Sequence, residues 1–232
     1  TYDVAPHVFK ELGADVIKLA CKPDGININE NCGSMHPEEL VANIKEHSAD
    51  FGIAFDGDGD RVIIADRNGE LLNGDKLIYL IVKSYEALGN RLPGVVGTVM
   101  TNMAMELALK EQGYEFVRAK VGDRYVVEEL LKRNWLVGGE ASGHLLCLDK
   151  HTTGDGILSA LQVLAGIVIL NQQPHEVIDW QDYPQTMINV RFTDKEFDWQ
   201  SAARDAIREV ETELNGKGRV IVRASGTEAL VR

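Results

Sequence analysis

Hydrophobic and polar positions alternate along the chain in blocks that predict helices and strands in turn. The apolar spacing predicts helices over residues 5–12, 36–47, 75–87, 104–112, 124–133, 156–171 and 199–214. Ser34 is a candidate cap for the second of these helices. Short apolar runs predict strands over residues 15–21, 51–55, 61–66, 69–72, 94–100, 114–120, 135–139, 144–149, 186–192 and 218–224. This alternation predicts an α/β fold with mixed sheets covered by helices. A polar stretch with two prolines over 172–185 is typical of a linker between domains.

Composition and charge narrow the class of protein. The chain has 232 residues, of which 44% are hydrophobic and 26% charged, and this balance is typical of a globular protein with its own core. The net charge of -12 disfavours nucleic acid and anionic membrane as partners. An acidic protein that handles phosphate must gather positive charge locally or recruit a cation.

Three cysteines and the lack of a targeting segment favour the cytoplasm. Cys21, Cys32 and Cys147 are odd in number and lack CxxC spacing, so we expect reduced thiols and no zinc site. No signal peptide is visible. The most apolar stretch, 157–170, is shorter than the ~20 residues of a membrane span and predicts a buried helix. Because the chain lacks an initiator Met and stops just after a strand, we expect a fragment of a longer protein.

An acidic loop follows the predicted strand 51–55. Its carboxylates alternate with glycine and belong to Asp56, Asp58 and Asp60. Three carboxylates this close repel one another unless a cation holds them, and oxygen ligands favour Mg²⁺ or Ca²⁺ over zinc. An EF-hand is excluded because Arg61 and Arg67 stand where its template needs Gly and Glu. The pattern predicts a Mg²⁺ site with the Arg61 charge beside it; the alternative is a solvated acidic turn.

A second polar loop follows the last predicted strand. Arg223, Ser225, Gly226 and Thr227 supply a guanidinium fork, hydroxyl donors and accessible backbone N–H groups, a combination that suits phosphate. Arg232 is close enough in sequence to join them. A polar turn after an edge strand is the alternative.

Two further loops carry candidate chemistry. In the loop 139–144, Glu140 and Ser142 can bond hydroxyl groups, and His144 is suited to proton transfer. In the other loop, Gly122, Asp123 and Arg124 open a predicted helix and can bind an anion, although Asp123 also suits a cap. Asp155 precedes a helix and predicts a cap.

Five motifs in this order resemble the α-D-phosphohexomutase superfamily: DGDGDR at 56–61, VGDRYV at 121–126, GEASGH at 139–144, TTGDG at 152–156 and RASGTE at 223–228. The stretches 13–33 and 96–126 resemble its branch that acts on glucosamine phosphates. The resemblance implies domain II over 1–70, with the metal loop. It implies domain III over 71–182, with the sugar loop, and part of domain IV over 183–232, with the phosphate loop. Domain I and its phosphoserine nucleophile are then missing, and the chain is expected to be inactive alone.

The resemblance also implies roles. Asp56, Asp58 and Asp60 would hold Mg²⁺, Arg61 would support the transferring phosphoryl group, and His144 would assist as acid or base. The loop 139–144 would contact the sugar hydroxyls. The loop 223–232 would bind the phosphate that does not react. The implied reaction converts glucosamine 6-phosphate to glucosamine 1-phosphate through a 1,6-bisphosphate, toward UDP-N-acetylglucosamine and peptidoglycan. The implied binding partners are these hexosamine phosphates. Whether the protein forms a homodimer is left open by the sequence.

Three alternatives remain at this point. The first is the same chemistry on mannose or glucose phosphates, with Ala141 as one position where specificity can differ. The second is a haloacid-dehalogenase-type phosphatase, which Gly59, Asp60 and the unexplained RASGTE disfavour. The third is a non-catalytic module that binds Mg²⁺ and a sugar phosphate. One departure from the family is Ala229, which stands where Pro usually follows SGTE, and which we expect to loosen that loop.

Overall fold

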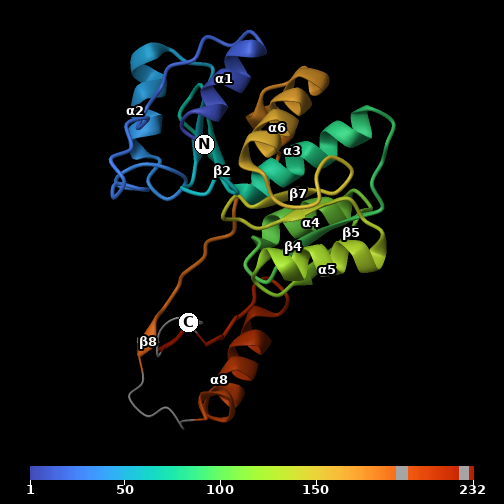
Figure 1. Cartoon of the computed structure of the whole chain (residues 1–232). Helices are drawn as coiled ribbons and strands as arrows, with labels where there is room; N and C mark the ends of the chain where they lie inside the picture. Colours follow the sequence, from blue (N-terminus) through green and yellow to red (C-terminus); the bar gives the residue numbers. More distant parts are fainter. Residues whose placement is uncertain (192–197, 225–229) are drawn as a thin grey trace. The chain divides into compact units, whose positions relative to one another are not determined.

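The computed structural model describes residues 1–191, 198–224 and 230–232 (Figure 1). These form two compact units, Thr1–Asp182 and Tyr183–Arg232, and each is considered by itself. The domain boundary predicted near residue 70 lies inside the first unit and stays a prediction.

The first unit opens with two helices and a three-stranded antiparallel sheet. The helices are α1 (Val4–Glu11) and α2 (Glu38–His47), and the sheet has the order β1 (Phe51–Phe55), β2 (Val62–Asp66) and β3 (Leu71–Leu72). In β1 and β2, Ile53 lies opposite Ile64. The Gly69 N–H donates to the Asp66 carbonyl and closes the hairpin turn between β2 and β3.

A four-stranded mixed sheet follows, in the order β5-β4-β6-β7. Strand β4 (Gly94–Thr98) pairs in parallel with β5 (Glu115–Ala119) and β6 (Val137–Gly139), and β7 (Leu145–Cys147) runs antiparallel to β6. The helices of this region are α3 (Gly74–Ala87), α4 (Met103–Glu111), α5 (Asp123–Arg133), α6 (Gly156–Leu170) and α7 (Pro174–Val177).

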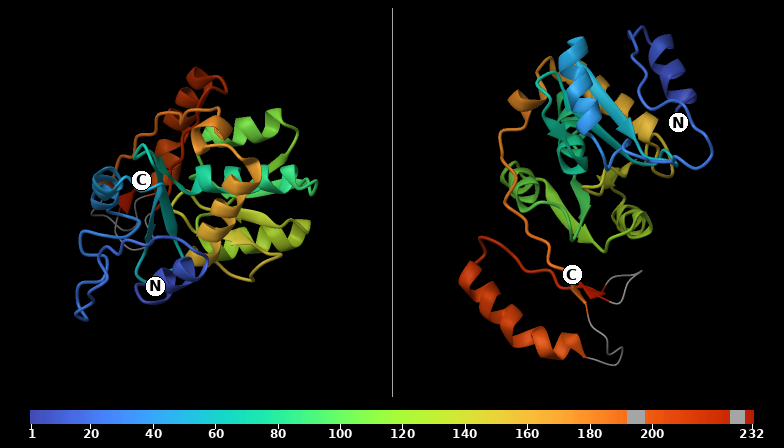
Figure 2. Two further views of the ribbon diagram at one scale, coloured as in Figure 1. Left: turned by 90° about the horizontal axis from the view of Figure 1, so that it is seen from above. Right: turned by 90° about the vertical axis from the view of Figure 1, so that its left-hand side faces the viewer.

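Two apolar clusters place these helices in layers. Val95 and Val137 of the sheet pack into one large cluster with apolar residues of α3, α4 and α6, whereas Val96 packs with α5 in another. Neighbouring residues of β4 therefore face opposite clusters, as the period of a strand requires. The larger cluster also takes in residues of β2, so one core joins both sheets. Helices α3 and α6 lie side by side (Figure 2).

Side-chain caps explain where several helices begin. Asn73, Asn102, Asp155 and Asp198 each accept a backbone N–H from the first turn of the helix that follows them. The cap predicted at Asp155 is confirmed. The cap predicted at Ser34 is wrong, because α2 starts only at Glu38 after Pro37 and shows no side-chain cap.

The second unit is small. Strands β8 (Val190–Arg191) and β9 (Leu230–Val231) pair antiparallel, and α8 (Trp199–Leu214) has the bounds that the sequence predicts. No residue of α8 is buried.

Two predicted strands are wrong. Residues 15–21 are mostly exposed and unpaired among the described residues, and 218–224 contribute only the bridge between Ala224 and Val231. An apolar run becomes a strand only when a neighbouring strand takes up its backbone hydrogen bonds.

Helix α6 is also less buried than predicted, since Val168 is 78% exposed. The α/β class itself is confirmed. Within the described parts of the chain, no helix combines the length and the apolar character needed to cross a membrane.

Candidate functional site

The loops with candidate chemistry follow the parallel strands of the four-stranded sheet. They lie at the side of the sheet where these strands have their carboxyl ends, which we call the sheet edge. Strands β4, β5 and β6 end at Thr98, Ala119 and Gly139, and since they run parallel, their carboxyl ends lie on the same side. The loops that follow them, 99–102, 120–122 and 140–143, therefore share this edge. Crevices at the carboxyl ends of parallel strands are where ligands bind in open α/β sheets.

The acidic loop is closed by its own first carboxylate. Asp56 is 4% exposed, and its Oδ1 accepts the backbone N–H groups of Gly59 and Arg61, both at 3.1 Å. Its Oδ2 accepts Arg61 Nε at 2.5 Å, and the same Nε lies 3.7 Å from Asp60 Oδ1. Arg61 therefore neutralises part of the charge that the sequence places in this loop.

The carboxyl groups differ in how easily they ionise. Burial acts to raise the pKa of Asp56, but the hydrogen bonds and charge of Arg61 outweigh it and lower the pKa. For Asp60, burial raises the pKa; His144 acts against this, while the charges of Asp56 and Asp58 add to it. A divalent cation would relieve this repulsion.

The residues present fit Mg²⁺. One carboxylate oxygen from each of Asp56, Asp58 and Asp60 lies within 4.8 Å of the other two, so the structure brings the three predicted ligands together. Asp60 Oδ1 is buried and accepts no hydrogen bond within the described chain. An all-oxygen set without His or Cys is typical of Mg²⁺ sites that leave positions open for water and phosphate.

His144 joins the sheet edge to the acidic loop. Its Nδ1 lies 3.1 Å from Asp60 Oδ2, and its backbone forms a bridge with Arg61. The side chain is only 6% exposed, and Nε2 is buried without a hydrogen-bond partner among the described residues. The imidazole therefore contacts a predicted metal ligand directly.

The loop before β7 is fixed by close backbone approaches. The Val62 N–H of β2 donates to the Gly143 carbonyl at 3.0 Å. Gly143 has φ +97°, and a Cβ there would lie 2.2 Å from the Val62 carbonyl oxygen. Only glycine fits this position without strain or displacement.

Glu140 links two of the loops. Its Oε1 accepts the backbone N–H of Gly122 at 2.9 Å, at the start of α5. Glu140 is half-buried and Ser142 is exposed. Asp123 and Arg124 are exposed, and Arg124 Nε bonds Glu128 Oε1 at 2.9 Å along α5. The structure thus brings Glu140 and Gly122 together, while the side chain of Arg124 contacts its own helix.

In the second unit, Arg223 and Arg232 lie opposite each other in an antiparallel backbone pairing. The backbone N–H of each donates to the carbonyl of the other, at 2.9 and 2.8 Å. The phosphate-loop residues Ser225, Gly226 and Thr227, and also Ala229, lie outside the described residues.

The loop after β4 contains buried polar residues that none of the sequence motifs marks. Thr98, Thr101 and Asn102 are buried, and the Asn102 N–H donates to the carboxylate of Asp75 at 2.7 Å. Lys120, exposed after β5, also lies outside these motifs. Both stand at the ends of predicted strands of an α/β fold, and that position was the available signal.

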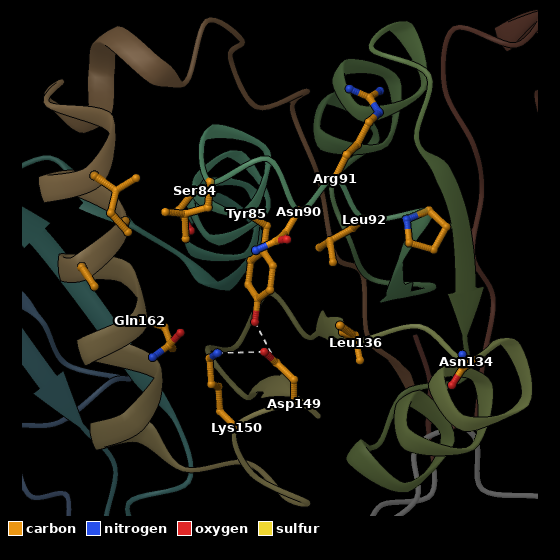
Figure 3. A pocket seen from close by; sticks show the side chains of 15 residues that line it. Ser84, Tyr85, Asn90, Arg91, Leu92, Asn134, Leu136, Asp149, Lys150 and Gln162 are labelled. Atoms are coloured by element: carbon orange, nitrogen blue, oxygen red, sulfur yellow. Dashed lines mark hydrogen bonds and ion pairs between the residues drawn. The ribbon is translucent and has the colours of Figure 1, made fainter.

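A cavity of about 500 Å³ lies elsewhere in the first unit (Figure 3). Leu92 and Asn134, which line it, precede β4 and β6, so it lies at the amino ends of these strands. There Tyr85 donates to Asp149 at 2.7 Å, and Asp149 pairs with Lys150. The cavity is therefore separate from the loops described above.

Models of three consecutive domains of one family match nearly the whole chain. They are "Phosphoglucomutase/phosphomannomutase, alpha/beta/alpha domain II" on residues 1–69, "alpha/beta/alpha domain III" on 73–183 and the "C-terminal domain" on 187–232. A phosphoglucosamine mutase of Neisseria subflava is 62% identical over 232 residues, which are 100% of this chain and 52% of that protein. The chain spans about half the length of the curated relatives it matches.

Solved structures show the same fold. A phosphoglucomutase/phosphomannomutase family protein from Burkholderia thailandensis has a TM-score of 0.74 at 23% identity, covering 98% of this chain and 52% of that chain. N-acetylphosphoglucosamine mutase from Aspergillus fumigatus, in complex with GlcNAc-6P and magnesium, has a TM-score of 0.74 at 20% identity, covering 98% and 58%. Together with the motifs, these matches confirm the predicted resemblance: the chain belongs to the phosphoglucomutase/phosphomannomutase family and contains its domains II, III and IV.

Proposed function

We propose that this chain is the metal-binding and sugar-binding part of a phosphoglucosamine mutase, which interconverts glucosamine 6-phosphate and glucosamine 1-phosphate. The observation that carries the proposal is the link from the acidic loop to the sheet edge: Asp60 contacts His144 at 3.1 Å, in the loop that also holds Glu140. The 62% identity to the Neisseria subflava enzyme supports the choice of sugar.

In this proposal the acidic loop holds the metal. Asp56, Asp58 and Asp60 would bind Mg²⁺, which when bound neutralises charge on the phosphoryl group in transfer. Arg61 holds Asp56 through its Nε and keeps a fixed positive charge beside the phosphoryl path. Asp56 stays ionised because Arg61 lowers its pKa.

The sheet edge holds the sugar. Glu140 uses Oε1 on the Gly122 N–H, so Oε2 is the oxygen that it would offer to a sugar hydroxyl. Ser142 is exposed two residues further on and would donate a second bond. The first turn of α5, with Gly122, Asp123 and Arg124, would add N–H groups suited to an anion.

His144 would act in the first place on Asp60. Its Nδ1 bonds that carboxylate and its ring is buried, so it orients a metal ligand. The role of acid or base expected from the sequence needs Nε2, and that atom has no hydrogen-bond partner in the described structure. Proton transfer through Nε2 stays a prediction.

The second unit would grip the phosphate that does not react. Arg223 and Arg232 are brought together by their backbone bonds, and the residues between them include Ser225, Gly226 and Thr227. One guanidinium can donate two parallel N–H bonds to phosphate oxygens, so arginines at these two positions suit this role.

The nucleophile would come from outside these 232 residues. The resemblance implies a phosphoserine in domain I, and no family model of that domain is among the three that match here. A serine that gives and recovers a phosphoryl group accounts for a 1,6-bisphosphate intermediate. We therefore expect the chain alone to bind Mg²⁺ and sugar phosphate without turnover.

The experiment is a specificity comparison in a completed protein. The chain is joined in frame to the flanking segments of the Neisseria subflava enzyme, and kcat/KM is measured with Mg²⁺ for glucosamine, glucose and mannose 6-phosphates. A preference for the amino sugar supports the proposal. A preference for glucose or mannose moves the sugar assignment to the sister branches and leaves the site assignments in place.

The phosphatase alternative has its own test. A serine phosphate survives acid, whereas an aspartyl phosphate is cleaved by alkali and by hydroxylamine. Labelled phosphate that stays on the completed protein in hydroxylamine supports the phosphoserine. Loss of the label would assign the nucleophile to the acidic loop.

A further inference from the structure

We infer that Asp75 is a positioning residue that holds the sugar-binding loop 140–143 in place through the first turn of α3. The inference rests on the proposed function in one respect, namely that Glu140 and its loop contact the sugar. Asp75 belongs to no motif that the family resemblance uses, and it touches none of the predicted metal ligands.

The first turn of α3 lies between two of the loops at the sheet edge. On one side the Gly74 N–H donates to the Ala141 carbonyl at 3.0 Å. The approach is so close that a Cβ on Gly74 would lie 1.9 Å from the Glu140 carbonyl oxygen. The backbone of α3 at Gly74 is therefore in direct contact with the loop that carries Glu140.

On the other side, Asp75 holds the loop after β4. Asp75 is 1% exposed, and its Oδ2 accepts the Asn102 N–H at 2.7 Å. A hydrogen bond to the Thr101 side chain adds to this contact. Arg118 fixes the same loop from β5, with Nη1 donating to the carbonyls of Thr98 and Thr101 at 2.9 and 2.8 Å.

These bonds form one connected path. Arg118 holds the loop after β4, that loop donates to Asp75, and the neighbouring Gly74 donates to the loop after β6. Loss of the Asp75 carboxyl would free the first turn of α3 on one side. The loop 140–143 would then lose its support on the α3 side, while the bonds of Gly122 to Glu140 and of Val62 to Gly143 would remain.

A capping role alone does not account for Asp75. The N-cap of α3 is Asn73, whose side chain accepts the Lys76 N–H at 3.1 Å. The Asp75 carboxyl instead leaves its own helix and accepts from a residue 27 positions away. Its Oδ1 is buried without a hydrogen-bond partner among the described residues, so this contact comes at a cost in desolvation. The charged groups around it are Arg118 on β5 and Asp182 at the end of the unit.

The first test is amide hydrogen exchange in the 232-residue chain. In Asp75→Ala we expect exchange in both 99–102 and 140–144 to rise about tenfold. Asp75→Asn keeps an oxygen acceptor for the Asn102 N–H and is expected to exchange no faster than the parent. The control is Ser84→Ala, which removes a buried hydroxyl bond at the other end of α3 and should leave both segments unchanged. A rise confined to 99–102 would overturn the inference.

The second test is steady-state kinetics in the completed protein, with glucosamine 6-phosphate as substrate. Asp75→Ala is expected to raise KM about tenfold with a smaller change in kcat, and Asp75→Asn to restore KM. A purely structural role would lower the folded fraction and hence the apparent kcat, and leave KM unchanged. An unchanged KM in folded Asp75→Ala would overturn the inference, as would equal impairment in Asp75→Asn.

Two outcomes have their own interpretation: a variant that does not fold, and a completed parent protein without activity. If Asp75→Ala does not fold, Asp75→Glu replaces it, because the extra methylene displaces the carboxylate that accepts the Asn102 N–H at 2.7 Å. Faster exchange of 140–144 in Asp75→Glu then supports the inference, and unchanged exchange overturns it. If the completed parent protein has no mutase activity, the proposed function fails, and the exchange experiment still decides whether Asp75 positions the loop.

Discussion

His144 Nδ1 lies 3.1 Å from Asp60 Oδ2, and this contact joins two segments that are 84 residues apart in the chain. Asp60 belongs to the loop after β1 of the antiparallel sheet, and His144 belongs to the loop before β7 of the mixed sheet. The contact therefore couples the predicted metal site to the predicted sugar site. In the proposed function this contact lets His144 orient a metal ligand, a role that does not depend on proton transfer.

Loss of this contact is expected to weaken Mg²⁺ binding. In His144→Ala, Asp60 loses the group that orients it, and we expect the affinity for Mg²⁺ to fall by about 10–100-fold. His144→Asn places an amide N–H close to the position of Nδ1 and should recover most of the affinity. Isothermal titration of the 232-residue chain with Mg²⁺ measures this.

The matched control is His47→Ala on the exposed end of α2, where no loss is expected. Circular dichroism confirms that each variant is folded. Equal Mg²⁺ affinity in folded His144→Ala and the parent chain would contradict a role in orienting Asp60.

Asp56 and Asp58 are expected to respond differently to the same substitution. Asp58 is exposed, so Asp58→Asn should weaken Mg²⁺ binding with little change in thermal stability. Asp56 is buried and accepts three hydrogen bonds, so Asp56→Asn should also destabilise the fold by about 1–3 kcal/mol. Thermal unfolding without metal separates the two effects. Equal melting temperatures for the two variants would contradict the claim that the hydrogen bonds of Asp56 stabilise the fold.

Mg²⁺ itself is expected to stabilise the chain. A ligand at 100 times its dissociation constant adds about 2.7 kcal/mol to the free energy of unfolding. Melting temperatures measured with increasing MgCl₂ should rise and return to the starting value with EDTA. The same titration of a chain with Asp56, Asp58 and Asp60 all changed to Asn should be flat. A rise in that variant would place the stabilising ion elsewhere.

Gly143 is expected to tolerate no side chain. Gly143→Ala combines a positive φ with a Cβ 2.2 Å from the Val62 carbonyl oxygen, so it should be more destabilising than φ strain alone. Gly89→Ala is the control, because Gly89 has φ +77° with nothing within 4 Å of the new Cβ. We expect the unfolding free energy of Gly143→Ala to lie at least about 2 kcal/mol below that of Gly89→Ala. Similar denaturant midpoints would show that the loop can move away.

The buried carboxyl of Asp75 makes stability depend on pH. Burial raises its pKa to about 6 from an ordinary 3.8, with the Asn102 N–H acting against this. The folded state therefore disfavours the ionised form, and the stability present below pH 3.8 is lost as pH rises through 6. The gap of about two units corresponds to roughly 3 kcal/mol as an upper bound.

The amide of Asp75→Asn resembles the protonated carboxyl at every pH. We expect this variant to match the parent chain near pH 4 and to be more stable at pH 7 by up to about 3 kcal/mol. Urea unfolding of both proteins at each pH gives the difference and cancels the other titrating groups. A difference that does not change with pH would contradict the raised pKa.

Structural features that depend on a single short segment of the chain could be predicted from the sequence. The DGDGDR loop places its carboxylates together because the carboxylates, the glycines and Arg61 all lie within the six residues 56–61. Helix α8 was predicted to the residue, since Asp198 caps it and its polar and apolar positions follow the helical period.

What could not be predicted depends on segments far apart in the chain. The contacts His144–Asp60, Gly122–Glu140 and Asn102–Asp75 join different strands and helices, and no local periodicity encodes them. The missing strand at 15–21 has the same cause, because its apolar run finds no partner among the described residues.

The most direct test of the account is the Mg²⁺-dependent conversion of glucosamine 6-phosphate by the completed protein, followed by phosphorus NMR. We expect glucosamine 1-phosphate to form only with Mg²⁺ and a catalytic amount of the 1,6-bisphosphate, and not in the variant with all three acidic-loop carboxylates changed to Asn. Conversion by that variant at the parent rate, or no conversion by the parent protein of any hexose or hexosamine 6-phosphate, would contradict the account.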